Sequence, residues 1–333
     1  MARWTWFEGV GLFAIVLAAC SSADDAQALP DSSAPPSLVE TTTEAVSGGL
    51  SAAEYLFDQN ELRTFELIVS EDDLATLDAD PAAEEYVDGT LLFEGQELSG
   101  VGVRYKGSVG AFVGCLDGPN LFEPSGAKTC PKLSMKVKIT HTDPDLEFFG
   151  QRRLQFHAMN LDPTQMRERL GYWLFAEMGV PTPRAVHARL LINGEFVGVF
   201  ALVEQIDGRF TRANFDDGTG NLYKEVWPTS SAAGLEDEAT PISAYRDSLR
   251  TNEDEDPSFE IIDGFARAII DALPDERGSV LAEYMDVEAL LAYTAVDRTI
   301  RHDDGPFHFY CDERCSAHNF FLYEDPAVGQ LHL

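Results

Sequence analysis

The stretch that says most about the fold is AVHARLLINGEFVGVFALVEQID, residues 185–207. Two apolar runs, rich in branched and aromatic side chains, flank Asn193-Gly194, a dipeptide that favours the two-residue turns of β-hairpins. The stretch therefore predicts two antiparallel strands that meet at this turn. Just upstream, TQMRERLGYWLFAEMGVP at residues 164–181 has apolar residues at helical spacing and ends in Gly-Val-Pro, which predicts a helix.

Further strands are expected on the N-terminal side. RTFELIVS at residues 63–70 alternates apolar and polar side chains, and two strand-like runs surround Glu94-Gly95. KLSMKVKIT at residues 132–140 also alternates, with Leu, Met, Val and Ile on one face and three lysines on the other. Two interpretations stay open for the lysines: a face that binds an anion, or a solvated edge strand on which lysines deter aggregation.

The C-terminal side is different in character. Residues 235–257 are acidic and predict a mobile connector, and residues 258–301 predict a mainly helical region. The order of elements predicts an α+β domain over residues 51–333. We expect a sheet-rich lobe over about 51–207 and a mostly helical lobe over about 208–333.

Charge excludes some classes of partner. The 333 residues include 57 acidic and 24 basic side chains, which gives a formal net charge of −33. Nucleic acid and anionic lipid are polyanions, so neither is expected to bind the surface in general. A small nucleotide is not excluded, because it needs only a local cationic pocket.

The N-terminus predicts export. Arg3 precedes a short apolar segment that ends in Leu-Ala-Ala-Cys at residues 17–20, which resembles the lipobox of bacterial lipoproteins. We expect residues 1–19 to be a signal peptide and Cys20 to carry the lipid that anchors an exported protein to a bacterial membrane. Residues 20–50, rich in Ser, Ala, Pro and Thr, would be a disordered tether. An ordinary cleaved signal peptide with a chance cysteine is the alternative.

The other cysteines predict disulfides. Cys115, Cys130, Cys311 and Cys315 make an even number, and an exported protein meets oxidising conditions. Order along the chain favours Cys115–Cys130 and Cys311–Cys315. A four-thiolate zinc site is the rival interpretation, although neither pair has the usual Cys-x-x-Cys spacing.

Several motifs, read together, resemble the spore-coat CotH kinase family. They are GVGVRYKGS, KLSMKVKI, the run from RERLGYW to VEQID, GNLYKE, and HDDG followed by HNFFLY. The resemblance covers about residues 55–333. It implies an atypical protein-kinase-like fold. It also implies transfer of the γ-phosphoryl group of ATP to Ser or Thr of exported proteins, with Mg²⁺ or Mn²⁺.

The resemblance also suggests residues that bind the nucleotide. Lys132 and Lys136 fall in the family's Lys-x-Ser-x-Lys strand, and Lys106 lies in RYKGS, so each is a candidate for the lysine that contacts phosphate. Glu168, on the helix at the regulatory position, is the candidate partner of that lysine. Glu204 would lie at the lobe hinge near the adenine, or would serve as a strand-end carboxylate or helix cap.

The motif HDDG supplies the candidate chemistry. By resemblance, Asp304 is the catalytic base that orients the acceptor hydroxyl, and Asn319 is a ligand for metal or phosphate. His302 is expected to order this loop through a hydrogen bond. Asp303 does not match the family, and adjacent side chains in extended backbone point in opposite directions.

One departure from the family leaves the activity open. Members continue from the aromatic strand into a Pro-Trp-Asp motif and an acidic metal-binding motif, whereas this sequence ends at EDPAVGQLHL. We therefore expect a sequence whose C-terminal part is missing, or an incomplete metal site. The alternatives to a kinase are an inactive surface lipoprotein that serves as a binding module, and an enzyme that transfers AMP.

Overall fold

A computed structural model describes residues 52–107, 109–118, 124–231, 237–308, 310–311 and 315–333. The predicted signal peptide, Cys20 and the whole of the predicted tether lie outside these residues. Within the part of the chain that is described, no helix is long and apolar enough to cross a membrane.

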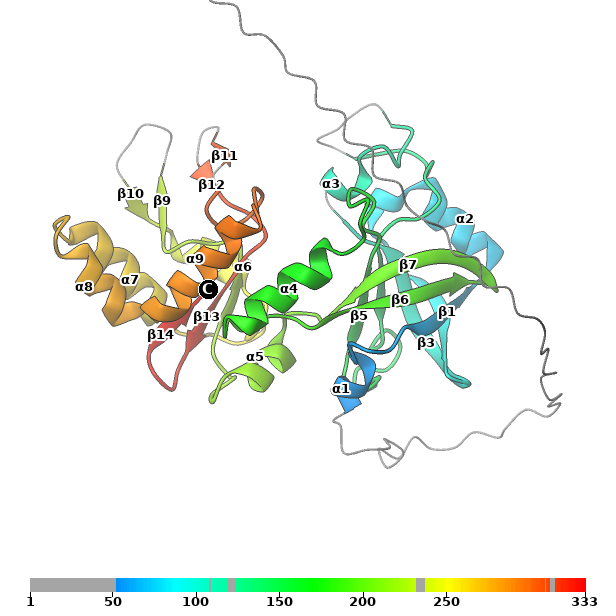
Figure 1. The fold of residues 1–333 in the computed structure, drawn as a ribbon, viewed down its shortest axis with the longest axis horizontal. Coiled ribbons are helices and arrows are strands. Elements are labelled where there is room, and N and C mark those ends of the chain that lie inside the picture. Colours follow the sequence, from blue (N-terminus) through cyan, green and yellow to red (C-terminus); the bar gives the residue numbers. More distant parts are fainter. Residues whose placement is uncertain (1–51, 108, 119–123, 232–236, 309, 312–314) are drawn as a thin grey trace, which may run out of the picture. The chain divides into compact units, whose positions relative to one another are not determined.

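The N-terminal part is built on a closed β-barrel (Figure 1). Its strands are β1 (Arg63–Val69), β2 (Val87–Phe93), β3 (Gln96–Tyr105), β4 (Met135–Lys138), β5 (Arg153–His157), β6 (Ala185–Ile192) and β7 (Glu195–Val203). Their order around the barrel is β1-β2-β3-β4-β5-β7-β6, and the parallel pairing of β1 with β6 closes it. The other neighbouring strands pair antiparallel, and two-residue turns join β2 to β3 and β6 to β7.

The predicted hairpin is confirmed. Ile192 pairs with Glu195, and the turn residues Asn193 and Gly194 have φ values of 51° and 84°. Two positive φ values are what a type I′ turn requires. The Asn193 side chain also accepts a hydrogen bond from the Val69 N–H (2.9 Å) and donates to the Val69 carbonyl (2.8 Å), which ties the turn to β1.

The two faces predicted for residues 132–140 are also confirmed. Leu133, Met135, Val137 and Ile139 are buried in the barrel core, where Phe rings from several strands pack together. The lysines between them lie on the outer face of the barrel. The strand itself is shorter than the pattern, because β4 includes only the middle of the alternating run.

Short helices surround the barrel. They are α1 (Ala52–Leu56), α2 (Glu71–Ala79), the 3₁₀ helix η1 (Pro81–Ala83), α3 (Val109–Phe112) and α4 (Arg167–Glu177). Helix α4 is the helix predicted over 164–181, and it starts where Asp162 accepts a hydrogen bond from the Arg167 N–H (2.8 Å). It ends before Gly179, which has a φ of 74°. Its Tyr172 packs against Ala201 and Val203 on the outside of the barrel.

The C-terminal part combines helices with a small sheet. The elements are α5 (Gly208–Asn214), β8 (Leu222–Lys224), β9 (Thr229–Ser231), β10 (Asp237–Ala239), α6 (Ile242–Ser248), α7 (Glu260–Asp271), α8 (Arg277–Tyr284), α9 (Val287–Thr299), β11 (Tyr310–Cys311), β12 (Cys315–Ser316), β13 (Phe321–Asp325) and β14 (Gln330–His332). Strands β14, β13 and β8 pair antiparallel in that order. The fold is therefore mixed α+β, with a sheet-rich N-terminal part and a more helical C-terminal part, as predicted.

The acidic segment before α7 is not merely a connector. It contains α6, and Tyr245 of this helix is fully buried and donates a hydrogen bond to the Pro228 carbonyl (2.9 Å). Leu249 is buried in the same core as Tyr223 of β8. The prediction for this segment was wrong in this respect, because two buried apolar side chains outweigh the acidic composition around them.

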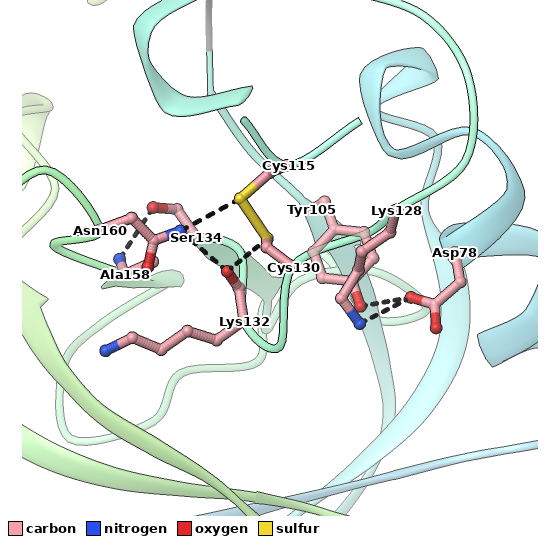
Figure 2. The surroundings of a disulfide bond; sticks show 9 residues. All are labelled: Asp78, Tyr105, Cys115, Lys128, Cys130, Lys132, Ser134, Ala158 and Asn160. Atoms are coloured by element: carbon pink, nitrogen blue, oxygen red, sulfur yellow. Dashed lines mark hydrogen bonds and ion pairs between the residues drawn. A yellow bond between two sulfur atoms is a disulfide. The ribbon is translucent and has the colours of Figure 1, made fainter. Parts of the chain in front are cut away.

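One of the two predicted disulfides is confirmed. Cys115 and Cys130 are bonded, with their Cα atoms 4.6 Å apart. Figure 2 shows this bond close to the start of β4 and the end of β5, where Asn160 Nδ2 donates to the Lys132 carbonyl (2.9 Å). Cys311 and Cys315 are opposite each other in the pairing of β11 with β12. Their side chains lie outside the described structure, so that disulfide stays a prediction.

Candidate active site

A cluster of cations occupies the outer face of the barrel on β3, β4 and β5. Arg104 pairs with Lys136 across β3 and β4, and Lys138 pairs with Arg153 across β4 and β5. Like charges directly opposite each other destabilise a sheet. Arg104 is paired with Glu84, but the other cations make this face a candidate site for an anion in a chain with a net charge of −33.

Lys136 is at the centre of this face. Burial, followed by the charges of Arg153, Lys106 and Arg104, lowers the pKa of Lys136 to about 8. Among the described residues, Lys136 and Arg153 form no ion pair with an acid. An anionic ligand would supply the missing counter-charge.

Lys106 follows β3 directly, at the edge of the cationic face. Its Nζ donates to Gln155 Oε1 (2.9 Å) and contacts Nε2 of His157 (2.7 Å). The other ring nitrogen of His157, Nδ1, is 2.5 Å from Oε2 of Glu168 in the first turn of α4. The predicted lysine and glutamate are therefore brought together, but a histidine stands between them. The sequence patterns did not single out His157.

Burial and several neighbouring charges act on the pKa of Lys106 in opposite directions. Burial is the main cause that lowers the pKa of Lys106 to about 8. The Glu168 carboxylate raises this pKa, whereas Lys224 and Arg104 lower it. Lys224 belongs to β8 in the C-terminal part, so both halves of the described fold contribute to the electrostatics of this lysine.

Lys132, the other predicted lysine, lies in a different environment. Its Nζ donates to the Val199 carbonyl of β7 (2.7 Å) and is 4.9 Å from the centre of the Phe200 ring. Burial lowers the pKa of Lys132. Lys106 acts on the pKa of Lys136, whereas no charged neighbour acts on the pKa of Lys132. The geometry therefore favours Lys106 and Lys136, which belong to the cluster of cations, over Lys132 as phosphate contacts.

Glu204, immediately after β7, is paired with an arginine. Its carboxylate accepts from Arg184 Nε (2.9 Å), a second guanidinium nitrogen (2.5 Å) and the Arg184 backbone N–H (3.1 Å). Glu204 is buried, with 5% of its surface exposed. This arrangement agrees with a strand-end carboxylate, one of the two roles that the sequence left open.

The HDDG loop follows α9 and is held by a buried acid. Asp297, in the last turn of α9, is fully buried, and its Oδ1 is 3.0 Å from Nδ1 of His302. The predicted hydrogen bond from His302 is therefore confirmed. Gly305 packs so closely that a Cβ atom there would lie 2.8 Å from Asp297 Oδ1. Asp297 and Gly305 together set the path of the loop that carries Asp304.

Asp304 and Asn319, the two residues of the candidate chemistry, are in contact. Asn319 Nδ2 donates to Oδ2 of Asp304 (2.8 Å) and to its backbone carbonyl (2.9 Å). Asn319 has a φ of 55°, a left-handed conformation that asparagine tolerates better than most residues. Asp303 instead pairs with Arg301 (3.4 Å), so the two adjacent carboxylates have different partners.

Lys224, the last residue of β8, and Glu225, which follows it, complete this half of the site. Glu225 Oε1 accepts from the Asn319 backbone N–H (3.0 Å) and pairs with Lys224 Nζ (3.3 Å). The same Lys224 lowers the pKa of Lys106. Both residues lie in the GNLYKE motif, but their roles could not be inferred from the sequence, because they depend on distant residues. Asn319 lies 94 positions after Glu225, and Lys106 lies in the barrel part of the chain.

The described residues offer limited support for a bound metal. They contain no group of three or more His, Cys, Asp or Glu side chains placed to hold a metal ion. Asp304 and the Oδ1 atom of Asn319 provide adjacent oxygen donors. Mg²⁺ commonly takes one or two carboxylates and completes its shell with substrate phosphates and water, so this pair fits part of such a site.

Comparison with known families agrees with this geometry. The family model described as CotH kinase protein matches residues 103–332, which is more than half of the chain. The chain belongs to the CotH kinase family. The match includes the cationic face, α4, the Asn193-Gly194 hairpin, and the Asp304–Asn319 pair.

Two curated proteins of the CotH type are similar over shorter stretches. "Spore coat protein homolog 1" of Rhizopus delemar is 25% identical over 171 residues, which is 49% of this chain and 27% of that protein. "Inner spore coat protein H-like protein" of Bacillus subtilis is 29% identical over 111 residues, 29% of this chain and 36% of that protein. The aligned part thus spans about a quarter to a third of the length of these relatives.

Proposed function

We propose that this chain has an atypical protein-kinase-like fold and transfers the γ-phosphoryl group of ATP to a Ser or Thr hydroxyl of an exported or surface protein. Membership of the CotH kinase family supports kinase activity. The observation that carries the proposal is the link through Lys224. This residue connects the electrostatics of Lys106 on the barrel with the Glu225–Asn319–Asp304 chain of contacts in the C-terminal part.

The residues of the candidate site would have different roles in phosphoryl transfer. Lys106 and Lys136 would neutralise phosphate oxygens, which is the main catalytic requirement of this reaction. Asp304 would accept the proton of the acceptor hydroxyl. The hydroxyl oxygen then bonds to the γ-phosphorus as the bond between that phosphorus and the β–γ bridging oxygen breaks. ADP leaves with the electron pair of that bond.

Mg²⁺ or Mn²⁺ is the expected metal. When bound, it would neutralise charge on the phosphate oxygens. Asn319 would be its protein ligand, next to Asp304. The hydrogen bond from Asn319 holds the Asp304 carboxylate in a fixed orientation, whichever ion the site takes.

The test compares two adjacent carboxylates. We expect Asp304→Asn to lower phosphoryl transfer by about 100-fold or more, the usual contribution of a general base, while nucleotide binding is retained. Asp303→Asn is the matched control and should transfer at the rate of the unchanged protein, because Asp303 pairs with Arg301 on the surface. Transfer is measured by intact mass of an acceptor protein incubated with ATP and Mg²⁺ or Mn²⁺.

The same experiment separates the alternatives. Addition of AMP instead of phosphate to the acceptor would assign the chain to nucleotide transfer. Nucleotide binding without any transfer, or no nucleotide binding with either metal, would assign it to an inactive binding module. Equal transfer by the Asp304→Asn variant and the unchanged protein would refute the choice of base.

We also propose that the protein is a lipoprotein on the exported side of a bacterial membrane, anchored through Cys20. The support is the Leu-Ala-Ala-Cys motif followed by a Ser- and Pro-rich tether. The Cys20→Ser variant of the full chain, expressed in bacteria, should move from the membrane fraction to the soluble fraction. An unchanged distribution would refute the anchor.

A further inference from the structure

Three side chains form a continuous line from α4 to the cationic face. Glu168 of α4 contacts Nδ1 of His157 (2.5 Å), and Nε2 of His157 contacts Nζ of Lys106 (2.7 Å). His157 is the last residue of β5, and Lys106 follows the last residue of β3. An ordinary ion pair would join the lysine and the carboxylate directly. Here the imidazole ring separates them.

The chemistry of these groups fixes the direction of the hydrogen bonds. A lysine ammonium has three donors and no acceptor, so Nε2 of His157 must accept and carry no proton. Nδ1 then carries the proton of the neutral ring and donates it to the Glu168 carboxylate. The contacts therefore require a neutral His157 whenever Lys106 is charged. A second proton on the ring would remove the acceptor and place two positive charges in contact.

The other charged groups near this line have opposing effects. The titratable groups that act on the line from the packed elements are Glu84 before β2, Arg104 of β3, Lys136 of β4, Tyr172 of α4 and Lys224 of β8. Glu84 favours the charge of Lys106, while Arg104 and Lys224 oppose it. The His157 ring itself contacts Lys106 and Glu168.

We propose that His157 is a positioning residue that links α4 to Lys106 and holds the Lys106 ammonium group where it would contact phosphate. The consequence for phosphate rests on the proposed function. The link itself does not. Helix α4 holds the ring through Glu168, and it also packs on α9 through Phe175 and Tyr293, whose ring centres are 4.9 Å apart. The position of α4 is therefore transmitted to Lys106 through one histidine.

The link is tested first without any nucleotide. Protein with ¹⁵N-labelled histidine is examined by NMR at pH 7, and the His157→Gln variant identifies the His157 signals. We expect the Nδ1–H form of the ring. In Lys106→Met, the Nε2–H form should become populated, because the donor that occupies Nε2 from 2.7 Å has been removed. His187, which lies under the same helix and contacts the Gln165 carbonyl, should not respond.

Two results would overturn the link. One is an Nε2–H form of His157 in the unchanged protein at pH 7, and the other is the same proportion of the Nδ1–H and Nε2–H forms in Lys106→Met and the unchanged protein. Both are measured on folded protein, since the His187 signal reports whether the barrel and α4 are intact. Neither measurement requires that the chain bind ATP, so a failure here is distinct from a failure of the proposed function.

The consequence for binding is tested with ADP at pH 7. Glutamine in place of His157 can accept from Lys106 and donate to Glu168, whereas leucine can do neither. We expect His157→Leu to weaken ADP binding about tenfold, the equivalent of one lost hydrogen bond to a charged group, and His157→Gln to retain most of the affinity. The NMR signal of His187 shows whether His157→Leu is folded. Equal ADP affinity in folded His157→Leu and the unchanged protein would overturn the positioning role.

Discussion

Nucleotide binding should weaken as pH rises above 8. Lys106 and Lys136 both have a pKa lowered to about 8, chiefly by burial, whereas an ordinary lysine stays charged far beyond this pH. Phosphate binds the charged form. Affinity should therefore be constant at lower pH and fall as each lysine loses its proton.

The size of the fall follows from the pKa. A group with a pKa of about 8 is about 90% charged at pH 7 and about 10% charged at pH 9. Each lysine that contacts phosphate should therefore reduce affinity about tenfold between these values, and both together about 100-fold. The dissociation constant of a fluorescent ADP analogue, measured at pH 7, 8 and 9 and constant ionic strength, gives this slope directly.

Arginine variants identify the lysine responsible. In Lys106→Arg, the loss of ADP affinity between pH 7 and pH 9 should be about tenfold smaller than in the unchanged protein, because arginine keeps its charge throughout this range. Lys132→Arg is the control and should retain the full slope, since Lys132 donates to the Val199 carbonyl. The reasoning would be refuted by an affinity that does not change from pH 7 to 9, or by equal slopes in the unchanged protein and Lys106→Arg.

Two further predictions concern stability. Replacing Cys115 and Cys130 with serine should lower the free energy of unfolding by about 3 kcal/mol, as expected for opening a loop of 15 residues, and should shift the urea midpoint accordingly; an unchanged midpoint would contradict this. Arg184→Met should cost at least about 2 kcal/mol in the same assay, because it leaves the buried Glu204 carboxylate without its main partner. If Arg184→Met instead weakens ADP binding with no change in unfolding, Glu204 belongs to the nucleotide site.

Much of the barrel could be predicted, because each strand repeats a local pattern. The turn at Asn193-Gly194 requires two positive φ values, which few dipeptides supply so readily. The alternation over residues 132–140 separates a buried face from a lysine face, and it survives although β4 covers only part of the run. The acidic composition around Tyr245 led to the wrong prediction of a mobile connector, because an average over the segment does not show that one aromatic ring is buried.

The candidate site was predicted less completely. Lys106, Lys136 and Glu168 were found by resemblance, and the structure brings them close to one another. The bridge through His157 was missed, since a single histidine at a strand end has no distinctive local pattern. Lys132, which shares a face with Lys136 in the alternating run, proved to have a different contact.

The amino-acid sequence alone was enough to establish strand faces, the hairpin, the Cys115–Cys130 pair and the family, because these depend on neighbours along the chain or on motifs. Tertiary structure was needed to show which charges meet. The contact of Lys106 with His157 spans 51 positions, and that of Glu225 with Asn319 spans 94. Such contacts exist only after the barrel closes and β8 pairs with β13, and the pKa values of the lysines follow from the burial that this closure produces.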